Sequence, residues 1–224
     1  MNLLARTFFG FGFLFVVMGL AVFGAAGTTA VWRGWAFLGV FAGCSGLITA
    51  WLWRHDKALL ERRVRAGPGA ERDPAQNLIQ ALAGVAFLGS LVAPGLDYRF
   101  HGASLPTWVA IFGDALIALG FYIVFRTFRV NSFASGVVER MDDQTLVDTG
   151  PYRLVRHPMY AGALLMFVAM PFALGSWWGL AVIPLILGAL IWRLIAEERF
   201  LVEHLAGYGE YRGRVRWRLA PGLW

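Results

Sequence analysis

The sequence predicts an all-α integral membrane protein with about six transmembrane helices, the last two of which form a helical hairpin. Hydrophobic residues make up 58% of the 224 residues and charged residues only 15%, far outside the composition of ordinary soluble domains. The apolar residues gather in runs of about 20 residues, the length that crosses a hydrocarbon core of roughly 30 Å. No stretch between these runs could build a separate soluble core. We therefore expect a single membrane domain over residues 1–224.

Four of the expected spans lie in the first part of the chain. They cover about 7–26, 31–53, 78–96 and 105–128, and Pro94-Gly95 is the candidate end of the third. A cleaved signal peptide is the competing interpretation of the first run, but that run exceeds the usual apolar region of ~7–15 residues. The fourth span carries Asp114, which suggests either a functional role or a hydrogen bond between helices. We leave Asp114 outside the site.

The fifth and sixth spans are expected at about 158–175 and 177–196. Only the short Gly175-Ser176 link separates them, so they must form an antiparallel hairpin. Pro158 suits the first position of a helix, where its missing N–H would be unpaired in any case. The start of the fifth span and the end of the sixth therefore lie at the same membrane surface.

Basic residues are distributed unevenly between the two sides of this topology. Eighteen of the 20 Lys and Arg residues fall on the side of the N-terminus, the two long polar segments and the C-terminal tail, and only Arg33 and Arg99 fall opposite. This asymmetry predicts that both termini are cytoplasmic. The stretch Lys57–Arg65 can form an amphipathic surface helix, and we interpret it as an orientation signal rather than a binding element. The excess of Arg over Lys suggests a prokaryotic protein. We therefore expect this multi-pass protein in a prokaryotic plasma membrane.

Composition also argues against several other classes of protein. Cys44 is the single cysteine, so neither a disulfide framework nor a cysteine-based zinc site is available. The four histidines are scattered with no spacing that suggests a metal site. The net charge of +6 is accounted for by membrane orientation, so we expect no nucleic-acid partner.

The most informative stretch is residues 150–162, GPYRLVRHPMYAG, which leads into the fifth span. Arg156 and His157 directly precede the expected helix start at Pro158. Free backbone amides and the helix dipole at that start favour a bound anion. A plain membrane anchor has no need of such a cationic corner, so the stretch indicates a binding site.

Acidic residues are expected to face this corner from the end of the sixth span. Arg193 is followed there by Glu197 and Glu198, and the hairpin brings these residues opposite Arg156 and His157. One side then offers cations and amides, and the other offers carboxylates for an ammonium group or hydroxyls. The alternative is that both glutamates simply pair with the arginines as a solvated helix end.

The motifs RHPMYAG at 156–162, EERFL at 197–201 and GYGEYRGRV at 207–215 together resemble the isoprenylcysteine carboxyl methyltransferase and phospholipid methyltransferase superfamily. Asn131-Ser132-Phe133 and the run 146–152 fit the same pattern. The resemblance is detailed over about 131–221, the expected catalytic and cofactor-binding half, whereas the first four spans match only in hydropathy.

The resemblance implies a methyltransferase that uses S-adenosylmethionine, with a pocket formed by the connector 129–157 and the helical C-terminal tail. It implies cofactor contacts at Arg156, His157, Tyr160, Gly162, Glu197, Glu198 and Leu201. Further candidates for cofactor contact are Tyr152, Pro158 and, with an open role, His204. Arg156, Arg193, Glu197 and Glu198 are the candidate catalytic residues. Their expected roles are an anion contact for Arg156, ribose or ammonium contacts for the glutamates, and orientation of the acceptor for Arg193. No metal is implied.

The methyl acceptor and the competing functions stay open at this point. A lipophilic acceptor from the bilayer is implied, and an isoprenylcysteine carboxylate, phosphatidylethanolamine or a small thiol or amine would all suit. The ending 215–221 lacks the Val-Pro pair of the eukaryotic carboxyl methyltransferases and loosely resembles membrane sterol reductases. An NADPH-dependent reductase is therefore the main alternative, and a non-catalytic lipid-binding protein is a third.

Overall fold

The computed structural model describes residues 2–65, 74–136 and 144–224, and within them every regular element is helical. The first hairpin consists of α1 (Leu3–Gly19), which continues as a π-helical turn to Gly24, and α2 (Trp32–His55). The short helix α3 (Lys57–Arg65) follows α2 directly and matches the expected surface helix. The remaining helices are α4 (Pro74–His101), α5 (Thr107–Phe128), α6 (Pro158–Leu174), α7 (Ile183–His204) and α8 (Tyr208–Arg214).

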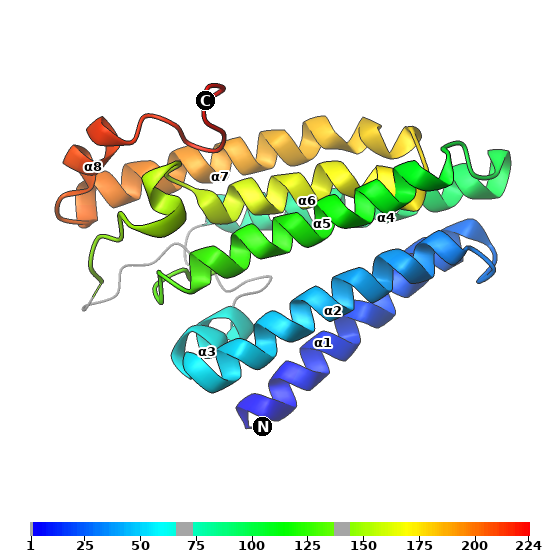
Figure 1. Cartoon of the computed structure of the whole chain (residues 1–224), viewed down its shortest axis with the longest axis horizontal. Helices are drawn as coiled ribbons and strands as arrows, with labels where there is room; N and C mark the ends of the chain where they lie inside the picture. Colours follow the sequence, from blue (N-terminus) through cyan, green and yellow to red (C-terminus); the bar gives the residue numbers. More distant parts are fainter. Residues whose placement is uncertain (1, 66–73, 137–143) are drawn as a thin grey trace.

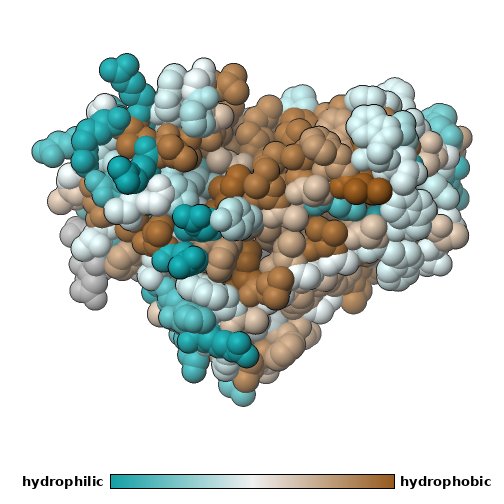
Figure 2. Space-filling model, viewed as in Figure 1, coloured by the Kyte–Doolittle hydropathy of each residue, from teal (hydrophilic) through white to brown (hydrophobic). Residues whose placement is uncertain are grey.

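Five helical segments in the described residues are long and apolar enough to cross a membrane: Leu3–Gly24, Trp32–His55, Pro74–His101, Thr107–Phe128 and Trp178–His204. The fifth expected span corresponds to α6, which has 17 residues and is shorter than these. Large apolar side chains are exposed along the helices, including Phe8, Leu47 and Trp108. Figure 2 shows hydrophobic residues over the middle of one face and hydrophilic residues gathered near one end. Such an apolar surface suits a hydrocarbon environment.

The helices α4, α5, α6 and α7 form one bundle, and the hairpin of α1 and α2 diverges from it toward the end that carries α3 (Figure 1). The buried core between the two parts includes Met18, Phe37, Ile117 and Met170. α8 and the connector before α6 lie at the same end as α3. That end of the bundle therefore collects the polar segments.

The hairpin of α6 and α7 has the expected turn. Gly175 ends α6 with a φ of 79°, a left-handed conformation that glycine adopts without a steric penalty. A 3₁₀ turn over Trp178–Val182 then leads into α7. α7 continues to His204, so Glu197 and Glu198 belong to its last two turns.

The expected end of the third span at Pro94 is wrong. α4 passes through Pro94 and continues to His101, with Pro94 and Gly95 both buried. Neighbouring helices can accommodate the missing hydrogen bond of a proline inside a membrane helix. α4 can pack closely on the π-helical turn after α1 because Gly95 has no side chain. An added Cβ would lie only 2.7 Å from the carbonyl oxygen of Val22.

Candidate functional site

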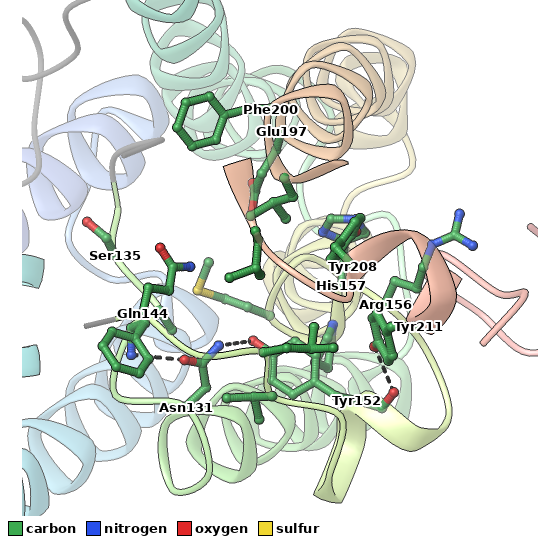
Figure 3. Close-up of a pocket in the computed structure, with 18 of the residues that line it drawn as sticks. Asn131, Ser135, Gln144, Tyr152, Arg156, His157, Glu197, Phe200, Tyr208 and Tyr211 are labelled. Carbon is green, nitrogen blue, oxygen red and sulfur yellow. Dashed lines mark hydrogen bonds between the residues drawn. The ribbon is translucent and has the colours of Figure 1, made fainter. Parts of the chain in front are cut away.

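A pocket of about 850 Å³, counted with its open mouth, lies where α6 begins and α7 ends. The segments around Asn131 and Gln144 form one wall, and α7 with α8 forms another (Figure 3). Eight of the residues expected at the site line this pocket: Tyr152, Arg156, His157, Pro158, Tyr160, Arg193, Glu197 and Leu201.

α6 begins at Pro158, as expected, with His157 at the N-cap position. No side chain caps this helix start. The first amides of an α-helix have no partner within the helix, so those of Met159 and Tyr160 are available at the pocket wall. This arrangement places the positive end of the helix dipole next to the cavity.

Arg156 and Glu198 form a buried ion pair beside the pocket. Arg156 Nε lies 2.6 Å from Glu198 Oε1, and both side chains are 5% exposed. His157 Nε2 is 3.3 Å from the same oxygen, and Arg218 Nε donates to the other carboxylate oxygen at 3.0 Å. Both carboxylate oxygens of Glu198 therefore bind side chains of the protein rather than groups in the pocket.

The same corner anchors the C-terminal tail. The backbone amides of Arg156 and His157 donate to the carbonyl oxygens of Trp217 and Arg218, each at 2.9 Å. Arg156 Nη1 also donates to the carbonyl oxygen of Val215 at 3.0 Å. Arg156 thus ties the start of α6, the end of α7 and the tail together.

Glu197 differs from Glu198 because its side chain belongs to the pocket wall. It lines the pocket, and one of its oxygens, Oε2, accepts a short hydrogen bond from the Tyr160 hydroxyl. Arg193 Nε donates to the same hydroxyl at 3.0 Å. In the part of the chain that the structure describes, the second oxygen, Oε1, makes no hydrogen bond. A carboxylate oxygen is therefore available to a cation or a hydroxyl in the cavity.

Three tyrosines complete the polar part of the pocket. Asn131 Nδ2 donates to the Tyr152 hydroxyl at 2.7 Å, and the Tyr211 hydroxyl donates to the backbone oxygen of Tyr152 at 2.8 Å (Figure 3). The hydroxyl of Tyr208 is buried and has no hydrogen-bond partner among the described residues. Burial, and then the negative charge of Glu198, raises the pKa of Tyr208, so this hydroxyl remains a neutral donor.

Three of the expected site residues do not line the pocket. Gly162 packs against α5, where an added Cβ would meet the carbonyl oxygen of Gly120 at 2.7 Å. Glu198 is held in the ion pair described above. His204 is exposed and hydrogen-bonds the backbone oxygen of Phe200 at 2.8 Å. Asp114, which was left outside the site, does not line the pocket either.

Sequence reasoning left out several residues that the structure places in the pocket wall or its frame, among them Asn131, Phe200, Tyr208, Tyr211 and Arg218. Asn131 and Tyr208 belong to motifs on which the family resemblance rests. Their roles depend on side-chain direction, which a single sequence does not reveal.

Comparison with known proteins finds one family whose model matches part of the chain. Residues 108–207 match the phospholipid methyltransferase family. This match confirms the resemblance to the isoprenylcysteine carboxyl methyltransferase and phospholipid methyltransferase superfamily. No curated protein gives a significant match to the chain. The matched segment covers α5 from its second residue onward, together with α6 and α7, and with them the Arg156, Tyr160, Arg193 and Glu197 side chains.

The matched family suggests membrane methyltransferase activity. α8 and the tail lie beyond the matched segment, yet Tyr208 and Tyr211 contribute to the pocket and Arg218 contacts Glu198. The site is therefore built from the phospholipid methyltransferase segment and from residues that follow it.

Proposed function

We propose that this protein is an integral membrane methyltransferase that uses S-adenosylmethionine to methylate a lipophilic acceptor. The observation that carries the proposal is the position of Glu197, with a carboxylate oxygen available to the same cavity as the amides at the start of α6. A cofactor with both an ammonium and a carboxylate needs one acidic and one positive wall. The family match supplies the reaction class.

The residues of the pocket fit this cofactor. Glu197 would hold the ammonium group or a ribose hydroxyl, and the amides at the start of α6, with His157, would hold the methionyl carboxylate. The unpartnered Tyr208 hydroxyl would gain a hydrogen bond that it otherwise lacks. When bound, the cofactor supplies a methyl group on a positively charged sulfur.

The reaction requires little acid–base chemistry from the protein. The cofactor, when bound, would supply its methyl group to a lone pair of the acceptor, and the electron pair of the broken carbon–sulfur bond would stay on sulfur. An amine acceptor then releases a proton to solvent, whereas a carboxylate or thiolate has none to lose. The protein's contribution is therefore positioning and exclusion of water.

Arg193 and Tyr160 are the proposed positioning groups for the acceptor. They are hydrogen-bonded to each other and lie at the edge of the pocket next to the bundle interior. Arg156 and Glu198 act indirectly, because their ion pair fixes the start of α6 against α7. Arg156 also lines the pocket, so its expected direct contact with the cofactor stays a prediction.

We also propose that the pocket opens to the cytoplasm, with both termini on that side and the site within about 131–221 of a single membrane domain. The distribution of Arg and Lys supports this orientation. Reporter fusions at the C-terminus and within the 102–106 link would test it. A cytoplasmic signal from the link would contradict the proposal.

Calorimetry of the purified protein in detergent tests the cofactor. We expect micromolar binding of S-adenosylmethionine and none of NADPH. NADPH binding without S-adenosylmethionine binding would contradict the proposal. Incubating membranes with methyl-labelled S-adenosylmethionine and identifying the labelled product by mass spectrometry would then reveal the acceptor.

A further inference from the structure

A second cavity adjoins the pocket from the side of the bundle interior. It measures about 1280 Å³ with its open mouth and lies between α4, α6 and α7. Apolar residues form most of its wall, including Ile79 and Gly84 of α4, Phe167 of α6, and Ile186 and Leu190 of α7. A cavity with such a wall suits hydrocarbon chains.

The two cavities share part of their walls. Ser135, Met159, Tyr160 and Arg193 line both of them. A molecule whose tail lies in this side cavity would therefore present its polar end to the residues that border the cofactor pocket. Tyr160 and Arg193 mark that junction.

Arg63 adds a charge to the side cavity from outside the matched family segment. It belongs to α3, where Arg65 is a surface residue that pairs with Glu61 and is 65% exposed. Arg63 instead lines the side cavity. Arg63 therefore lies on the side of α3 that faces the protein interior. The sequence predicts only an orientation signal for this helix and does not predict such an inward arginine.

The contacts of Arg63 leave much of its hydrogen-bonding capacity unused. Nη1 lies 3.4 Å from the backbone oxygen of Ser135 and 3.6 Å from the sulfur of Met159, and the guanidinium sits 5.3 Å from the Phe128 ring centre. Among the described residues no carboxylate lies within 4 Å of it. A guanidinium has five N–H donors, so these neutral contacts do not satisfy it.

Arg63 keeps its positive charge in the side cavity. Burial lowers the pKa of Arg63, Tyr160 opposes that shift, and the charge of Arg193 adds to the lowering. Arginine nevertheless stays protonated in proteins. A protonated guanidinium at the polar end of an apolar cavity attracts an anion.

We propose that the side cavity binds a lipid whose anionic group, a phosphate or a carboxylate, contacts Arg63, with the apolar chain along α4, α6 and α7. The inference rests on the proposed function in one respect: this lipid is the methyl acceptor, and its reacting atom lies at the wall near Tyr160. Arg63 is then a specificity-determining residue, since a neutral lipid leaves it without a counter-charge.

The test measures binding of dioleoyl phosphatidic acid and dioleoylglycerol to the purified full chain in detergent by native mass spectrometry. The two lipids share their tails and differ in the phosphate. We expect a preference of about tenfold or more for the phosphate lipid, the effect of one charge-assisted hydrogen bond. Arg63→Gln should remove the preference, and Arg63→Lys should keep part of it.

Arg65→Gln is the matched control, because it removes an exposed charge from the same helix. It should keep the full preference. A preference that survives in Arg63→Gln, or that falls equally in Arg65→Gln, overturns the proposal. Oleate replaces the phosphate by a carboxylate and should also bind in an Arg63-dependent way, whereas inorganic phosphate alone should bind at least tenfold more weakly than the lipid. Equal binding of free phosphate would overturn the lipid as the source.

Gly84→Leu tests the apolar wall independently of any folding defect at Arg63. An added Cβ at Gly84 meets no atom within 4 Å, so a larger side chain can extend into the side cavity. Both lipids should bind several-fold more weakly to this variant, with their ratio unchanged, and unaltered affinity for both contradicts the proposal. S-adenosylmethionine calorimetry on the same samples separates the two proposals, because failure of cofactor binding with an intact lipid preference contradicts only the proposed function.

Discussion

Arg156 Nε donates a hydrogen bond of 2.6 Å to Glu198 Oε1, and this pair joins the first residues of α6 to the last turns of α7. Both side chains belong to the motifs that mark the site, but Arg156 lines the cavity whereas Glu198 does not. The pair therefore acts as a clamp. It fixes the relative position of the helix start and the carboxylate that together define the pocket.

Glu198→Gln should destabilise the protein strongly. The substitution removes one charge from a buried cluster and leaves Arg156 and Arg218 without their counter-ion. Breaking a buried ion pair by removing one partner costs about 3–5 kcal/mol. The melting temperature in detergent is the measurement, with Glu203→Gln as the control because Glu203 is exposed on the same helix. Equal melting temperatures for the two variants would contradict the clamp.

Glu197→Gln should instead weaken cofactor binding while the fold is retained. A hydrogen bond to a charged group is worth about 1.5–3 kcal/mol, which corresponds to roughly a tenfold to hundredfold loss of affinity for S-adenosylmethionine. Calorimetry provides the affinity, and the melting temperature verifies folding. Glu210→Gln, at an exposed position of α8, should bind as the unmodified protein does. Undiminished affinity in Glu197→Gln would place the acidic wall elsewhere.

The sequence predicts that the α6–α7 hairpin brings the two sides of the site together. Two helices joined by a tight turn at Gly175 must bring Arg156 and His157 opposite the glutamates, and they do. The sequence could not say which glutamate faces the cavity. Neighbouring residues of a helix point about 100° apart. Only the rotation of α7 in the bundle decides that Glu198 meets Arg156 and Glu197 meets Tyr160.

The same limit explains the other differences. Arg63 lies in a basic helix that the sequence predicts correctly, but the rotation of a nine-residue helix about its axis depends on tertiary contacts. Gly162 lies in a motif associated with the cofactor, yet the packing of α6 on α5 determines its surroundings. The continuation of α4 beyond Pro94 likewise depends on neighbouring helices, because proline alone favours a break.

Tyr160→Phe should affect turnover more than cofactor affinity. The hydroxyl joins Arg193 to Glu197, so its loss frees Arg193 from one constraint without removing the carboxylate. A lost hydrogen bond of about 1–2 kcal/mol predicts a decrease of roughly tenfold in methyl incorporation. The measurement is transfer of labelled methyl groups into membrane lipids at saturating cofactor. A loss of cofactor affinity with unchanged saturated turnover would contradict a role for Tyr160 in orienting the acceptor.

Gly162→Ala should destabilise the bundle rather than empty the pocket. An added Cβ would lie 2.7 Å from the carbonyl oxygen of Gly120 and 3.0 Å from Val124, at the close contact of α6 with α5. Overpacking of this kind costs about 1–3 kcal/mol. Gly188→Ala is the control, because its Cβ meets no atom within 4 Å and alanine is favoured over glycine in a helix by roughly 1 kcal/mol. We expect a lower melting temperature only for Gly162→Ala, with S-adenosylmethionine affinity retained in the folded protein. Loss of that affinity at an unchanged melting temperature would show that Gly162 contacts the cofactor after all, because no packing defect would then be present to account for it.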